Sequence, residues 1–94
     1  MKVVITRHPA LVELLRELGL TDESTPVLSH ASPADVEGKH VFGVLPLSLA
    51  SLAEKVTEIP LALTPGDRGV ELTLERMKQI AGEPTTYVVS RVGR

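Results

Sequence analysis

Short apolar segments alternate with longer amphipathic ones along the chain. Five short segments are rich in β-branched or other apolar residues, which is typical of buried strands; they are residues 2–6, 27–28, 40–44, 59–63 and 85–89. Between them, apolar residues recur at helical spacing, which predicts helices over residues 9–18, 46–56 and 73–81. Residues 32–38 predict a further helical turn, because Ser32 can cap it and Pro33 suits its first position.

This alternation of strands and helices predicts a sheet with helices on both of its faces. We therefore expect an α/β fold: a minimal Rossmann-like domain of three layers, with a mainly parallel five-stranded sheet, over residues 1–94. We find no internal repeat, linker or low-complexity segment. The pattern thus indicates one domain built around one sheet.

Composition narrows the choice of partners. Aromatic residues make up 2% of the chain, namely Phe42 and Tyr87, so little surface is available for stacking nucleic-acid bases. The net charge of −2 argues against binding along the backbone of duplex DNA. Without cysteine, neither disulfides nor thiolate metal ligands can form. Because no apolar run could span a bilayer and the N-terminus lacks the layout of a signal peptide, we expect no membrane association and a cytoplasmic location.

The polar residues that follow the predicted strands are the candidate functional residues. In an open parallel sheet, ligands bind beyond the carboxyl ends of the strands. The residues expected at that edge are Thr6, Arg7, His8, Ser29, His30, Leu45, Ser48, Thr64, Arg68 and Arg91. They include three arginines and two histidines, and two helices begin nearby with unpaired N–H groups. This edge therefore suits phosphate or another compact anion.

Each candidate also has a purely structural interpretation. His8 could cap the helix that Pro9 opens, and His30 could be a satisfied histidine at the edge of the core. Arg7 could pair with Glu13, and Arg68 with a neighbouring carboxylate. Ser29 and Thr64 could simply cap turns. The shared edge, rather than any one residue, favours a binding site.

Several well-known kinds of site are not predicted. The first strand is not followed by G-x-G-x-x-G, and the chain has no Walker A motif. No spacing of histidines or carboxylates suggests a zinc or two-metal site, and Ser48 does not lie in a nucleophile elbow. We therefore expect no cofactor and no metal ion.

Four motifs carry a family resemblance: "ITRHPALVELL", "VLSH", "FGVLPLSLA" and "RGVEL". In this order and spacing they resemble a group of small Rossmann-like accessory proteins encoded beside type III CRISPR systems, and the resemblance covers most of residues 3–77. This group resembles ring nucleases, which bind cyclic oligoadenylate, the second messenger of this antiviral defence, and cleave it. The resemblance implies a phosphodiesterase acting on this messenger, most naturally cyclic tetra-adenylate, which switches the signal off.

The resemblance also implies roles for the residues at the sheet edge. A ribose 2′-hydroxyl would attack the neighbouring phosphate without a metal ion, with Arg7, His8 and His30 as the catalytic residues. Substrate contacts would come from Thr6, Ser29, Leu45, Ser48, Thr64 and Arg68, with Arg68 closing from a mobile loop. A homodimer would match the symmetry of the ring. Two alternatives remain: a protein that sequesters the messenger without cleaving it, and a regulatory partner of another CRISPR protein.

Overall fold

Five strands form one mixed sheet in the computed structural model, which describes residues 1–93. The strands are β1 (Lys2–Ile5), β2 (Val27–Leu28), β3 (His40–Gly43), β4 (Lys55–Glu58) and β5 (Thr85–Tyr87). Their order across the sheet is β2-β1-β3-β4-β5. The pairings among the first four are parallel, whereas β5 runs antiparallel to β4. The α/β class predicted from the sequence is thus confirmed, but the sheet is mixed rather than mainly parallel.

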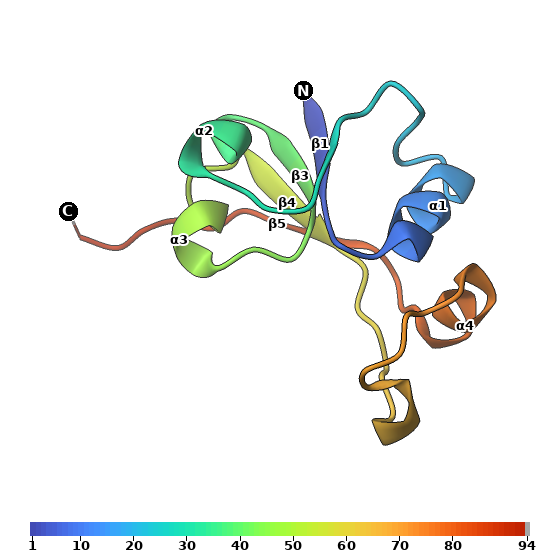
Figure 1. Cartoon of the computed structure of the whole chain (residues 1–94). Coiled ribbons are helices and arrows are strands. Elements are labelled where there is room, and N and C mark those ends of the chain that lie inside the picture. The colour runs from blue at the N-terminus through green and yellow to red at the C-terminus, as the bar shows by residue number, and fades with distance from the viewer. Residues whose placement is uncertain (94) are drawn as a thin grey trace.

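Side chains alternate between the two sheet faces, and each face packs against two helices (Figure 1). Val4 and Phe42 face a cluster formed with α1 (Pro9–Glu17) and α4 (Leu74–Ile80). Val3, Ile5 and Val41 face the other cluster, formed with α2 (Pro33–Val36) and α3 (Leu47–Ala50). Successive residues of a strand point to opposite faces of the sheet, and both faces are buried. The short strands therefore appear in the sequence as continuous apolar runs. None of the helices within residues 1–93 has the length and apolar character required to cross a membrane.

The region between β3 and α4 differs from the prediction. A helix was expected over residues 46–56, but α3 ends at Ala50, and Val56 lies in β4. The strand expected at residues 59–63 is instead β4, four residues earlier. Pro60 explains the difference, because proline cannot donate to a ladder within a sheet. An apolar stripe that includes Val56 fits a helical period as well as a strand, so the pattern alone did not separate the two.

The direction of β5 was also predicted wrongly. α4 ends beside the segment that follows β4, where the Gly82 N–H donates to the Pro60 carbonyl at 2.8 Å and Leu61 bridges Ala81. The chain therefore enters β5 at the carboxyl edge of β4 and can only run back along it. A polar row supports this arrangement, since Thr57 Oγ1 lies 2.6 Å from His40 Nε2 and 2.7 Å from Thr86 Oγ1. Residues after Tyr87 consequently lie away from the carboxyl edge.

Candidate functional site

A hollow of about 550 Å³ lies at the carboxyl edge of the central strands. We call it the main hollow. Its lining includes six of the residues predicted from the sequence: Thr6, Arg7, His8, Ser29, His30 and Leu45. Its size falls in the range of about 300–1,000 Å³ typical of small-molecule sites. The ends of β1 and β2 and the segment after β3 thus bring residues distant in sequence to one place.

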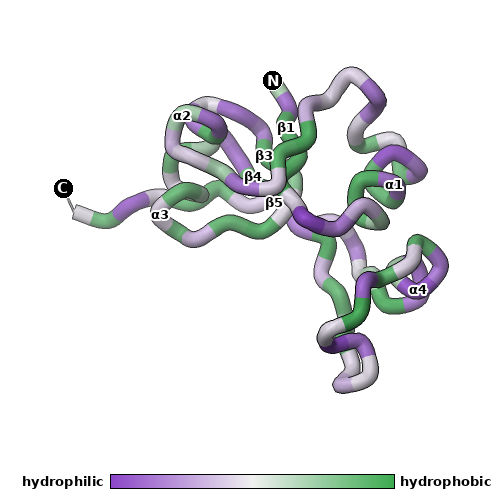
Figure 2. Tube along the Cα trace, viewed as in Figure 1, coloured by the Kyte–Doolittle hydropathy of each residue, from purple (hydrophilic) through white to green (hydrophobic). Residues whose placement is uncertain are grey.

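The turn between β1 and α1 presents Arg7 and His8. The Thr6 N–H donates to the Leu28 carbonyl at 2.9 Å, and the His8 N–H donates to Thr6 Oγ1 at 3.1 Å. His8 is the N-cap residue of α1, with Pro9 following at the first helical position, but its side chain makes no capping hydrogen bond. The imidazole of His8 is therefore not used as a helix cap. Figure 2 shows how hydrophilic this turn is between apolar β1 and α1.

Ser29 and His30 reach the main hollow from the end of β2. Both residues are exposed, so His30 is not a histidine buried at the edge of the core. Arg7 is also exposed, and no ion pair between Arg7 and Glu13 is found within the described part of the chain. The structural interpretations of His30 and Arg7 that the sequence left open therefore do not account for them.

Gly43 forms part of the floor of the main hollow, at the end of β3. Its φ is +140°, and a Cβ atom added there would lie far inside van der Waals contact with the carbonyl oxygen of Ile5. Ile5 is the register partner of Gly43 on the neighbouring strand β1, so the added Cβ would point into the backbone of β1. Next to Gly43, Val44 is 73% exposed at the rim. The φ and the nearby carbonyl together require glycine at position 43.

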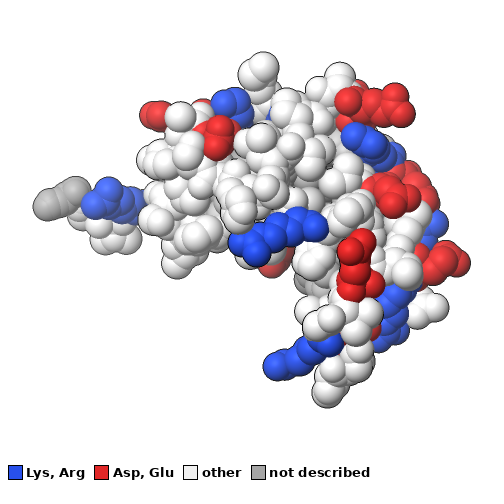
Figure 3. Space-filling view, in the orientation of Figure 1, with Lys and Arg blue, Asp and Glu red and all other residues white. Residues whose placement is uncertain are grey.

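Basic side chains, and no acidic ones, belong to the described lining of the main hollow. Its lining contains one arginine and two histidines, and no aspartate or glutamate is among the described residues that form it. Figure 3 shows a basic side chain in the middle of the face, near the turn between β1 and α1, with uncharged atoms above it and acidic atoms just below and to the right of it. Within residues 1–93, no three histidine or carboxylate side chains are grouped so as to hold a metal ion. Such a lining suits a compact anion.

Four predicted residues lie outside the main hollow, namely Ser48, Thr64, Arg68 and Arg91. Ser48 sits on α3 in a different groove, together with Val89, Ser90 and Arg91. Arg91 is there because antiparallel β5 carries the chain away from the carboxyl edge. Thr64 is the N-cap residue of the 3-10 helix η1 (Pro65–Asp67), and both its hydroxyl and its N–H donate to Asp67 Oδ2 at 2.9 Å. Thr64 therefore has a structural role in this conformation.

Arg68 lines a second hollow, which we call the loop hollow, that it shares with Arg7 and His8. A bidentate ion pair joins the loop that carries it to α4, and the expected mobility of this loop stays a prediction. Arg76 Nε donates to Asp67 Oδ1 and Arg76 Nη2 donates to Asp67 Oδ2, both at 2.9 Å. These bonds, followed by the one from the Thr64 N–H, lower the pKa of Asp67 well below its ordinary value of 3.8. The loop is therefore clamped next to Arg68.

The depressed pKa of Asp67 predicts an acid-dependent loss of stability. Unfolded chains bind a proton at Asp67 more readily than the folded protein does, so its contribution is present above pH 3.8 and is lost as the pH falls below that value. We expect the Asp67→Asn protein to have a lower melting temperature than the wild type at neutral pH. In acid, the two melting temperatures should become similar. Thermal unfolding of both proteins from neutral pH to about pH 3 measures this. A difference that stays constant over the whole range would contradict the assignment.

Sequence reasoning missed two residues on the floor of the main hollow. Ile59 and Leu61 line it because β4 ends at Glu58, so that the following residues pass under the carboxyl edge. The expected strand at residues 59–63 would have placed them inside the sheet. Pro60 was the available signal, because it excludes a central strand at this position.

The comparisons with known proteins assign the chain to a family. A family model described as "Putative CRISPR-associated protein (Cas_VVA1548)" matches residues 3–90. The matched range includes β2 through β5, all of β1 except Lys2, and every residue of the main hollow. Neither the curated proteins nor the solved structures contain a match to the chain. Since the match extends over most of its length, this chain belongs to the Cas_VVA1548 family of CRISPR-associated proteins.

Proposed function

We propose that this protein binds cyclic oligoadenylate, the second messenger of type III CRISPR immunity, and cleaves it in the cytoplasm without a metal ion. The observation that carries the proposal is the main hollow, where Arg7, His8 and His30 share one cavity whose described lining has no carboxylate. Membership of a CRISPR-associated family supports the same biological setting. The position at the carboxyl edge of parallel strands is where Rossmann-like domains bind nucleotides.

The proposed reaction uses the ligand's own 2′-hydroxyl. Its oxygen forms a bond to the adjacent phosphorus while the bond from phosphorus to the 5′-oxygen breaks. One imidazole, of His8 or His30, accepts the 2′ proton, and the other donates a proton to the departing 5′-oxygen. Arg7 binds the phosphate and stabilises the charge that develops in the transition state. The products are linear oligoadenylates with a 2′,3′-cyclic phosphate at one end and a 5′-hydroxyl at the other.

A second copy of the chain would complete the site. Three apolar side chains are exposed in the lining of the two hollows, and they are Val44 at 73%, Leu63 at 57% and Val70 at 59%. Val44 lines the main hollow, and Leu63 and Val70 line the loop hollow. Exposed apolar side chains beside a polar site commonly mark an interface. A two-fold dimer over this edge would enclose a symmetric ring between two copies of Arg7.

Turnover of cyclic tetra-adenylate tests the proposal. The ring is supplied in large excess over the protein, with and without a chelator, and the products are identified by chromatography and mass spectrometry. We expect linear products ending in a 2′,3′-cyclic phosphate in both conditions. The matched control is the His8→Ala/His30→Ala protein, which should keep its melting temperature, because both side chains are exposed, and should form no product.

The other outcomes identify the alternatives. Intact ring after many equivalents, together with a raised melting temperature on ligand addition, would mean that the protein sequesters the messenger. An unchanged melting temperature with saturating ring would instead indicate a regulatory interaction partner. Either result would overturn the proposed cleavage.

A further inference from the structure

Arg7 and His8 line three neighbouring hollows rather than one. Two of them are the main hollow and the loop hollow. The third, which we call the helix groove, lies along α1 and is lined by residues that include Val12, Glu13, Arg16 and Val27. Arg16 stands eight positions after His8, so the two backbones are about 12 Å apart along the helix axis. The hollows thus extend from Arg7 in two directions, toward Arg16 and toward Arg68.

The charge of Arg16 is not used within the described part of the chain. Its neighbour Glu17 is engaged elsewhere, because Lys78 Nζ lies 2.7 Å from Glu17 Oε1. Glu13, which also lines the helix groove, forms no ion pair with Arg16 among residues 1–93. Arg16 is exposed, so its guanidinium is available to an anion in the groove.

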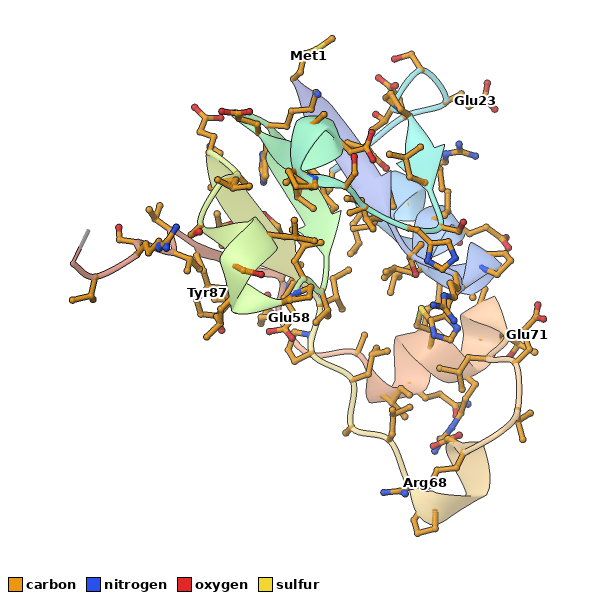
Figure 4. The ribbon with its side chains drawn as sticks, turned by 60° about the vertical axis from the view of Figure 1, so that its left-hand side comes forward. Met1, Glu23, Glu58, Arg68, Glu71 and Tyr87 are labelled. Carbon is orange, nitrogen blue, oxygen red and sulfur yellow. The ribbon has the colours of Figure 1, made fainter. Side chains whose placement is uncertain are left out.

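Arg68 is available for a similar reason. The neighbouring carboxylate, Asp67, already accepts two hydrogen bonds from Arg76. Glu71 lines the loop hollow but makes no ion pair with Arg68 in the described residues. Figure 4 shows Arg68 and Glu71 at separate places on this loop, with Arg68 projecting from it. The ion pair between Asp67 and Arg76 therefore occupies the neighbouring carboxylate and leaves the positive charge of Arg68 available.

We infer that the protein binds an oligonucleotide across all three hollows, with Arg16 and Arg68 each contacting a phosphate that flanks the one held by Arg7. This inference rests on the proposed function for the identity of the ligand, an oligoadenylate. It adds two phosphate-binding subsites and makes affinity depend on the number of phosphates. A single nucleotide would reach the main hollow alone, whereas a longer chain would also contact Arg16 or Arg68.

Equilibrium binding of linear 2′-O-methyl oligoadenylates carrying one to four phosphates tests the inference. These probes have no free 2′-hydroxyl, so binding is measured without cleavage. We expect the wild-type affinity to rise with each phosphate. Arg16→Gln and Arg68→Gln should each weaken binding of the four-phosphate probe about tenfold, the loss of one charge-assisted contact, and leave the one-phosphate probe unchanged.

The dependence of binding affinity on salt concentration gives a second measurement. A purely structural role of Arg16 or Arg68 would not change this dependence. For each variant, the slope of log affinity against log salt should fall in magnitude by about 0.7, the value for one phosphate contact on a single strand. Arg91→Gln is the matched control, because Arg91 is an exposed arginine in the separate groove beside α3. It should retain the wild-type affinity and slope.

Two kinds of result would overturn the inference. One is a wild-type affinity that is absent or independent of the number of phosphates; the other is an Arg16→Gln or Arg68→Gln protein that matches the wild type in both affinity and slope. Cleavage of the ring combined with unchanged binding by these variants would leave the proposed function in place. Binding that increases with length but is never followed by cleavage of the ring would support the subsites and overturn the proposed reaction.

Discussion

Arg7→Ala is expected to lower the rate of ring cleavage at saturating substrate by about 100- to 1,000-fold, the usual effect of removing one donor to a transition-state oxyanion. Arg7 is exposed, lines all three hollows, and forms no ion pair within the described residues. Its loss should therefore leave the fold intact while removing the central positive charge. The measurement is single-turnover cleavage, with thermal unfolding to confirm that the melting temperature is unchanged.

Two further variants sharpen this experiment. Arg7→Lys keeps the charge but loses the planar fork that binds two phosphate oxygens, so we expect it to recover only part of the rate. Arg91→Ala removes an arginine from the groove beside α3 and should cleave at the wild-type rate. An Arg7→Ala protein as fast as the wild type would show that the reaction takes place elsewhere.

Gly43→Ala is expected to be the most destabilising small substitution near the site. The new methyl group would collide with the Ile5 carbonyl, and alanine would have to adopt a φ of +140°. The backbone strain and the overpacking together should lower the free energy of unfolding by at least about 3 kcal/mol. For a domain of this size each kcal/mol lowers the melting temperature by roughly 4–8 °C. Thermal and denaturant unfolding would measure the loss.

Gly19→Ala separates the two causes of this effect. Gly19 also has a positive φ, +75°, but nothing lies within 4 Å of the position of an added Cβ. This control should lower the free energy of unfolding only by the cost of the left-handed backbone for alanine, roughly 1–2 kcal/mol. Equal melting temperatures for the two variants would mean that the close approach between β1 and β3 does not limit stability.

The first half of the fold could be predicted from local signals. β1, α1, β2, α2 and β3 lie where the sequence pattern predicted them, to within a residue or two. Pro9 and Pro33 begin their helices, and Gly19 and Gly38 follow them with φ of +75° and +71°. These signals act over a few residues, so they are visible without knowledge of the tertiary structure.

The second half depended on contacts between distant residues. Val56 suits a helix or a strand, and its pairing with Val41 and Tyr87 determines that it lies in a strand. The direction of β5 follows from where α4 ends, beside Pro60, which no local pattern encodes. Arg91 was placed at the carboxyl edge because β5 was expected to run parallel, and Ser48 because it follows β3 at the start of a helix; both lie in another groove.

The sequence by itself determined the α/β class, the early elements and the six residues that meet in the main hollow, because parallel strands deliver their following residues to a common edge. Only the tertiary structure decided that Ile59 and Leu61 form the floor, that Arg76 clamps the loop of Arg68, and that Arg16 stands in a groove beside Arg7. The physical reason is that hollows and ion pairs form between side chains from separate elements. Their positions are set when those elements pack, after local preferences have been satisfied.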